Sequence, residues 1–155
     1  MQKVLIMNRT AFTMIELIFV IVILGILAAV AVPKLAATRD DAKVSALAYS
    51  VGTGIQEVAA FATSKGETND SMELMSNNFA ELSKSGDANL SSDKAIIKCG
   101  KIDNCLIIDI NRTTTDDILQ MSLGDGAGDN MCLELQKLID YENYPIKLRG
   151  SYVKQ

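Results

Sequence analysis

The stretch FTMIELIFVIVILGILAAVAV, residues 12–32, decides how the N-terminal part of this 155-residue chain folds. It is 21 residues long and contains one charged side chain, Glu16. At about 1.5 Å per residue a helix of this length spans about 30 Å, which is the thickness of the hydrocarbon core of a bilayer. The stretch therefore predicts a transmembrane helix, which we expect to extend over residues 12–33.

The residues that precede this stretch include Lys3 and Arg9 and no acid. The positive-inside rule places them in the cytoplasm and everything after Val32 on the exported side. A cleavable secretory signal has the same layout, and Ala29-Val30-Ala31 matches the A-x-A pattern of its cleavage site. Glu16 argues against that alternative and against a plain anchor, because an unpaired carboxylate is costly in an apolar helix.

Residues 11–17, AFTMIEL, resemble the N-terminal motif of type IV pilins and type II secretion pseudopilins. In that family the prepilin peptidase removes a short basic leader before a residue that is usually Phe, and then methylates the new amino terminus. The resemblance implies a cut between Ala11 and Phe12, with Ala11 at a position where the family usually has Gly. Glu16 is then the fifth mature residue, the acidic position of the family, and Pro33 stands where many members have a helix-bending Pro.

The resemblance also implies how the chain assembles. The amine of mature Phe12 is a cation that can neutralise Glu16 of a neighbouring subunit, and this pairing favours assembly in a fixed register. We therefore expect Phe12 and Glu16 to carry assembly, with bends of the helix at Gly25 and Pro33. The implied partners are further copies of the chain, the prepilin peptidase and an inner-membrane assembly platform. The implied location is the bacterial inner membrane, with a cytoplasmic N-terminus and a periplasmic C-terminal domain, and later the filament.

After Pro33 the sequence becomes amphipathic, with apolar residues at helical spacing. These residues are Val44, Leu47, Val51, Ile55, Val58 and Ala62. Lys65 and Gly66 form a C-terminal stop signal, so we predict one long helix over about residues 12–63. Its first half is apolar on all sides, and only its second half can pack against a domain of its own.

The rest of the chain predicts shorter elements. Ser71 precedes a predicted helix at 72–83, and residues 86–92 are predicted to form a loop. β-Branched runs at 95–99 and 105–110 predict a hairpin with a five-residue turn. The later elements predicted are a strand at 118–123, a helix that Asp129 or Asn130 caps and that runs to residue 140, and a closing strand at 145–153.

This order of elements predicts an α+β fold, in which a long N-terminal helix, first transmembrane and then amphipathic, packs on a small antiparallel β-sheet. The resemblance to type IV pilins implies the same fold. The expected organisation is a leader at residues 1–11, a transmembrane and polymerisation segment at 12–33, and an exported globular domain at 34–155 that includes the amphipathic half of the helix.

Three cysteines, Cys99, Cys105 and Cys132, lie in the part that is expected to be exported, where an oxidising compartment permits disulfides. One pair is expected. Cys105 with Cys132 is slightly favoured, because closing a longer loop constrains the unfolded chain more. The alternatives are a pair between Cys99 and Cys105 across the hairpin, or three buried thiols.

Residues 123–130 combine three glycines with Asp125 and Asp129. We interpret them as a glycine-rich turn that leads into a capped helix, because their spacing does not match an EF-hand. The resemblance to major pseudopilins implies calcium binding in a C-terminal loop, which makes Asp125 and Asp129 the candidate ligands. No other cofactor is expected.

Composition narrows the possible functions. The chain has no His and no Trp, so His-based catalysis and His-containing metal sites are excluded, and an enzyme is not expected. Its net charge of −4 argues against a nucleic-acid partner. The expected function is a structural subunit of a type IV pilus-like or type II secretion pseudopilus filament, and the short exported domain slightly favours the pseudopilus. The alternative is a membrane-tethered or secreted monomeric periplasmic binding module, in which Glu16 would be dispensable.

Overall fold

A computed structural model describes residues 12–126 and 128–149. The expected leader and residues 127 and 150–155 lie outside the described residues. The chain divides into two compact units, with the division between Arg39 and Asp40.

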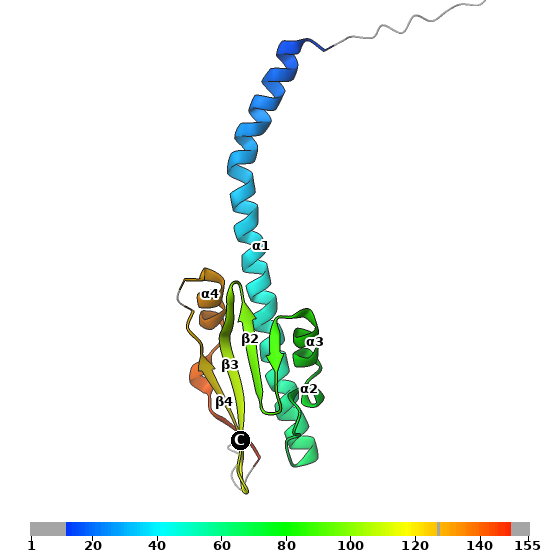
Figure 1. Ribbon diagram of the computed structural model, residues 1–155, viewed down its shortest axis with the longest axis vertical. Helices are drawn as coiled ribbons and strands as arrows, with labels where there is room; N and C mark the ends of the chain where they lie inside the picture. The colour runs from blue at the N-terminus through cyan, green and yellow to red at the C-terminus, as the bar shows by residue number, and fades with distance from the viewer. Residues whose placement is uncertain (1–11, 127, 150–155) are drawn as a thin grey trace, which may run out of the picture. The chain divides into compact units, whose positions relative to one another are not determined.

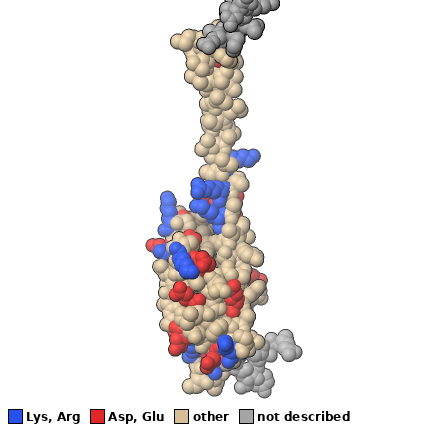
Figure 2. Space-filling model, turned by 90° about the vertical axis from the view of Figure 1, so that its right-hand side faces the viewer, with Lys and Arg blue, Asp and Glu red and all other residues tan. Residues whose placement is uncertain are grey.

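The first unit contains the N-terminal part of α1, a helix with the bounds Met14–Lys65. Every described residue of this unit is exposed, including large apolar side chains such as Phe19 and Leu27. Figure 2 accordingly shows this part of the helix as an almost unbroken tan surface. Among the described helices, α1 is the one that is long and apolar enough to cross a membrane. The predicted N-terminal helix that is apolar on all sides is therefore confirmed.

The second unit is a two-layer α+β domain built on a five-stranded antiparallel sheet in the order β1-β2-β3-β4-β5. The strands are β1 Ala88–Leu90, β2 Lys94–Cys99, β3 Ile102–Arg112, β4 Asp117–Leu123 and β5 Ile146–Arg149. Residues 40–65 of α1 lie against one face of this sheet (Figure 1). The predicted fold class, a long helix packed on a small antiparallel sheet, is confirmed.

The hydrophobic core lies between these two layers. Five of the six residues that the helical spacing predicted are buried, and Leu47 is partly buried against the core. The five are Val44, Val51, Ile55, Val58 and Ala62. β2 and most of β3 contribute alternate residues, because successive side chains of a strand point to opposite faces. The buried side chains include the cross-strand neighbours Ile97 and Leu106 on β2 and β3, and Ile110 and Leu119 on β3 and β4.

The segment between α1 and the sheet differs from the prediction. The predicted helix at 72–83 is two helices, α2 Met72–Met75 and α3 Asn77–Ser85. The break lies at Ser76, whose hydroxyl accepts a hydrogen bond from the Phe79 amide and caps α3, whereas Ser71 makes no side-chain cap. Glu57 of α1 accepts hydrogen bonds from the Ser76 hydroxyl (2.6 Å) and the Asn78 amide (3.0 Å). These bonds fix the start of α3 against α1.

Two further predictions about this region are wrong. Residues 88–90, in the predicted loop, form β1, which pairs with residues 95–97 of β2. The hairpin turn has two residues rather than five, because β3 begins at Ile102. Gly100 makes that tight turn possible with a φ of 60°, a conformation that residues with a Cβ rarely adopt.

The last part of the domain follows the predicted order more closely. β4 lies at the predicted third strand, and α4 Asn130–Leu138 ends two residues before the predicted end. A short 3₁₀ helix, η1 Tyr141–Asn143, precedes β5. The remainder of the predicted closing strand, from residue 150, lies outside the described residues.

Candidate functional site

The candidate site is the exposed apolar segment at residues 12–33, which includes the first part of α1. Its large side chains are between 44% and 85% exposed, the extremes being Ile23 and Phe12. A contiguous apolar surface of this kind marks a site for a membrane or for another protein. The sequence explains this apolar surface directly, because the stretch has no polar face and apolar side chains surround the helix on every side.

The one acid in this surface, Glu16, is held by Thr13. Its Oε2 atom accepts hydrogen bonds from the Thr13 amide and the Thr13 hydroxyl, both at 2.8 Å. The Glu16 amide donates in turn to the Thr13 hydroxyl at 3.3 Å. This reciprocal pair is a capping box, in which two of the unpaired amides at the start of a helix are satisfied by side chains.

Thr13 is a site residue that the sequence analysis missed. The signal was present, since Thr13-Met14-Ile15-Glu16 has the S/T-x-x-E spacing of a capping box directly before an apolar run. From the sequence, Glu16 is notable as a charge in an apolar helix. The structure adds that the same carboxylate determines where α1 begins, at Met14 rather than at Phe12.

The other residues predicted for processing and assembly are placed as follows. Ala11 lies outside the described residues, and Phe12 is exposed immediately before the cap. Gly25 has open space around it, and α1 continues through Pro33. Bending at these two positions stays a prediction.

The cysteines lie in the second unit. Of the pairings left open by the sequence, the structure has Cys105 of β3 joined to Cys132 of α4, with a Cα–Cα distance of 5.6 Å. Cys99 is buried and free. Burial, together with the nearby Asp129 and Asp87 carboxylates, raises the pKa of the Cys99 thiol to about 11, so the thiolate is disfavoured at neutral pH.

Asp129, one of the two candidate calcium ligands, caps α4. Its Oδ1 accepts from the Met131 and Cys132 amides, and its Oδ2 accepts from the Lys101 amide in the β2–β3 turn. These amide donors, that of Lys101 first, lower the pKa of the Asp129 carboxyl. One carboxylate thus joins a helix start to a hairpin turn.

Asp125, the other candidate ligand, is exposed in the loop before Asp129. Among the described residues there is no group of three or more His, Cys, Asp or Glu side chains placed to hold a metal ion. Calcium binding stays a prediction, which the unfolding temperature with and without calcium tests.

An ion pair with a buried acid closes the opposite end of the sheet. Asp117 of β4 is 2% exposed and accepts from the Arg149 side chain at 3.2 Å. It also accepts from the hydroxyl and the amide of Thr68, in the loop after α1. Burial acts to raise the pKa of Asp117, but Arg149 and Thr68 outweigh it, so the pKa is lowered.

A comparison with known protein families supports the interpretation of the exposed apolar helix as the candidate site. The family model described as the prokaryotic N-terminal methylation motif matches residues 6–32. No curated protein and no solved structure matched the chain. The motif marks a pilin-like substrate of the prepilin peptidase, and the proteins that carry it are structural rather than enzymatic. Residues 6–32 of this chain carry the N-terminal methylation motif, which is the signature of type IV pilins and pseudopilins.

Proposed function

We propose that this protein is a structural subunit of a type IV pilus-like or type II secretion pseudopilus filament. The prepilin peptidase cuts the precursor between Ala11 and Phe12 and methylates the Phe12 amine. The apolar helix at 12–33 then holds the subunit in the bacterial inner membrane, with the second unit in the periplasm. An assembly platform in that membrane moves subunits into the filament.

The observation that carries this proposal is the segment at residues 12–33, which is apolar and exposed on all sides and holds a single acid, Glu16. An exposed apolar helix requires apolar surroundings, which are lipid before assembly and the same helices of neighbouring copies afterwards. The helix can thus exchange one apolar environment for another, and the exported domain forms the surface of the filament.

Glu16 is the residue that separates this function from a simple anchor. Thr13 satisfies part of the carboxylate with two hydrogen bonds, but these bonds leave its negative charge uncompensated. A cationic amine from a neighbouring subunit would neutralise that charge in a low-dielectric environment. The pairing therefore favours the assembled state and one axial register between subunits.

The test is N-terminal sequencing and intact mass of the membrane-extracted protein, together with filament counts by electron microscopy. We expect a methylated Phe12 start, and we expect Glu16→Ala to abolish filaments. Glu134→Ala, which removes an exposed acid from α4, is the matched control and should leave filaments at the wild-type level. A chain that starts at Val32, or one that starts at Met1 and is indifferent to the loss of Glu16, would instead establish a secreted or simply anchored module.

A further inference from the structure

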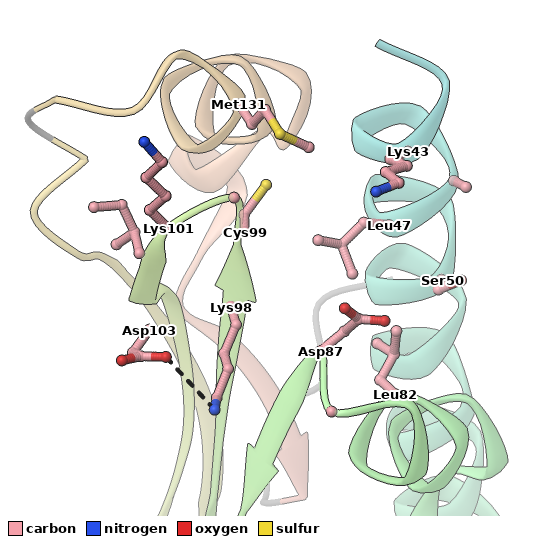
Figure 3. Close-up of a pocket in the computed structure, with 14 residues that line it drawn as sticks. Lys43, Leu47, Ser50, Leu82, Asp87, Lys98, Cys99, Lys101, Asp103 and Met131 are labelled. Atoms are coloured by element: carbon pink, nitrogen blue, oxygen red, sulfur yellow. Dashed lines mark ion pairs between the residues drawn. The ribbon is translucent and has the colours of Figure 1, made fainter. Parts of the chain in front are cut away.

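A groove of about 660 Å³ opens on the second unit between α1, the β2–β3 turn and the start of α4. Figure 3 shows Leu47 of α1 pointing across it toward Cys99 of β2 and Met131 of α4. Leu82 and Ile102 also line it, so its wall is largely apolar. A groove of this character can receive an apolar side chain from another molecule.

The rim of the groove has an excess of positive charge. Lys43, Lys98 and Lys101 line it, against Asp87 and Asp103. Lys98 is paired with Asp103 at 3.5 Å. The side chains of Lys43 and Lys101, in contrast, form no ion pair with any residue in the described ranges. The groove therefore presents two cations that are available to a partner, beside an apolar wall.

The same domain carries a complementary feature near the C-terminal end of α1. Leu74 on α2 is 69% exposed, although its neighbours Met72 and Met75 are buried in the core. Glu73 lies next to it and Glu67 lies in the loop before α2, both exposed and without an ion pair to the described part of the chain. An apolar side chain among acids is the counterpart of an apolar groove among lysines.

These two features cannot meet within one molecule. The groove is lined by α1 residues 43–50, near the start of the helical part of the second unit. α2 lies beside the other end of α1, as Figure 1 shows, where Glu57 bonds to the Ser76 that follows α2. A contact between different patches of identical subunits is heterologous, and such contacts build rings when the rotation between copies closes and open helical filaments when it does not.

We propose that the groove receives Leu74 of a second copy of this chain, with Glu73 and Glu67 of that copy facing Lys43 and Lys101. The proposal rests on the proposed function, because it supposes that copies lie with their helices parallel and displaced along the helix axis. Each copy contributes a groove to one neighbour and Leu74 to another. In the proposed filament, Glu16 sets the register between apolar helices. The contact at Leu74 would set a second register, between exported domains.

The first test is cysteine cross-linking of the full chain in membranes and filaments. Ala46 lines the groove and is exposed, so Ala46→Cys and Leu74→Cys are combined in a Cys99→Ala background that removes the thiol in the same groove. Mild oxidation should give a ladder of dimers and higher multimers on a non-reducing gel. The matched control pairs Ala46→Cys with Leu138→Cys, an exposed apolar position at the end of α4, and should give no ladder.

A charge exchange tests the same contact by a second route. Lys43→Glu with Lys101→Glu should reduce the cross-linked ladder about tenfold, because like charges then face each other across the contact. Adding Glu67→Lys with Glu73→Lys should restore it, because the pairing is re-formed with the signs exchanged. Two results would overturn the charge pairing. One is a ladder that the two lysine substitutions leave unchanged, and the other is a ladder that the added glutamate substitutions do not restore.

The outcomes separate this proposal from the proposed function. Methylated Phe12 and abundant filaments without an Ala46→Cys/Leu74→Cys ladder would overturn the docking and leave the filament function intact. Equal ladders from the test pair and the Leu138→Cys control would also overturn it, because the contact would then be nonspecific. A chain that is neither cut at Phe12 nor assembled would overturn both proposals.

Discussion

Glu16 Oε2 lies 2.8 Å from both the amide nitrogen and the hydroxyl oxygen of Thr13, so the carboxylate on which assembly is proposed to depend also closes the first helical turn. The two roles need different properties of the side chain. Capping needs an acceptor in the right place, and a Gln can supply one. Pairing with a cationic amine needs the negative charge.

Two variants separate these roles. Glu16→Gln keeps an acceptor for the Thr13 cap and loses the charge, so we expect processing to continue and filaments to be lost. Thr13→Ala removes the cap at a cost of about 1 kcal/mol and keeps the charge, so we expect filaments in reduced number. Filament counts and the intact mass of the processed chain measure both effects. Wild-type filament numbers in Glu16→Gln would contradict a role for the charge.

Gly54 and Gly52 should respond in opposite directions to the same substitution. A Cβ at Gly54 would lie 2.9 Å from the ring of Phe79, which is fully buried, so Gly54→Ala should destabilise the domain by about 1–3 kcal/mol. Gly52 has open space and lies in the same helix, so Gly52→Ala should stabilise it by up to about 1 kcal/mol. Thermal unfolding of the full chain in detergent compares the two. Equal shifts would show that the Phe79 contact does not limit position 54.

The disulfide should make a large contribution to stability. Cys105 and Cys132 are 27 residues apart in sequence, and replacing both with Ala should cost about 3 kcal/mol. A reductant should lower the unfolding temperature of the wild type and of Cys99→Ala, but not that of the double variant. If the double variant still responded to the reductant, its remaining cysteine, Cys99, would have to form a disulfide with another molecule.

Asp117 should make the domain sensitive to acid. Its pKa in the folded state is lowered below the ordinary value of 3.8, so its contribution is present above that pH and is lost as the pH falls through the folded pKa. Asp117→Ala should lower the free energy of unfolding by about 2 kcal/mol at neutral pH. This is less than the cost of breaking a fully buried ion pair, because Arg149 is 35% exposed. Asp117→Asn should flatten the fall in unfolding temperature at acid pH, whereas Asp41→Asn, at an exposed position on α1, should not.

Strong periodic patterns made much of this fold predictable. The 3.6-residue spacing of Val44, Val51, Ile55 and Val58 predicted the buried face of α1. The β-branched run Ile107-Ile108 and its neighbours predicted the centre of the sheet. In both cases many residues repeat one pattern, so that local preference and burial agree.

The features that could not be predicted depend on single contacts or on tertiary context. β1 has only three residues, Ala-Asn-Leu, and it forms because β2 offers an edge rather than because of its own preference. The helix break at Ser76 depends on Glu57, 19 residues away, which accepts from the Ser76 hydroxyl. The two-residue turn at Gly100 depends partly on Asp129, whose carboxylate binds the next amide from a distant loop.

The continuity of α1 has a mechanical consequence. Within the second unit, residues 40–65 of α1 supply Val44 to Ala62 of the domain core as one uninterrupted stretch of helix. In a filament of the proposed kind, a pull along this stretch would load the contact between helix and sheet in shear. The Glu57 bonds to Ser76 and Asn78 lie across a neighbouring contact, between α1 and α3, and would resist the sliding of α1. If the chain assembles as proposed, this part of the helix and the sheet would bear such a load together, so the domain would resist force as well as form a surface.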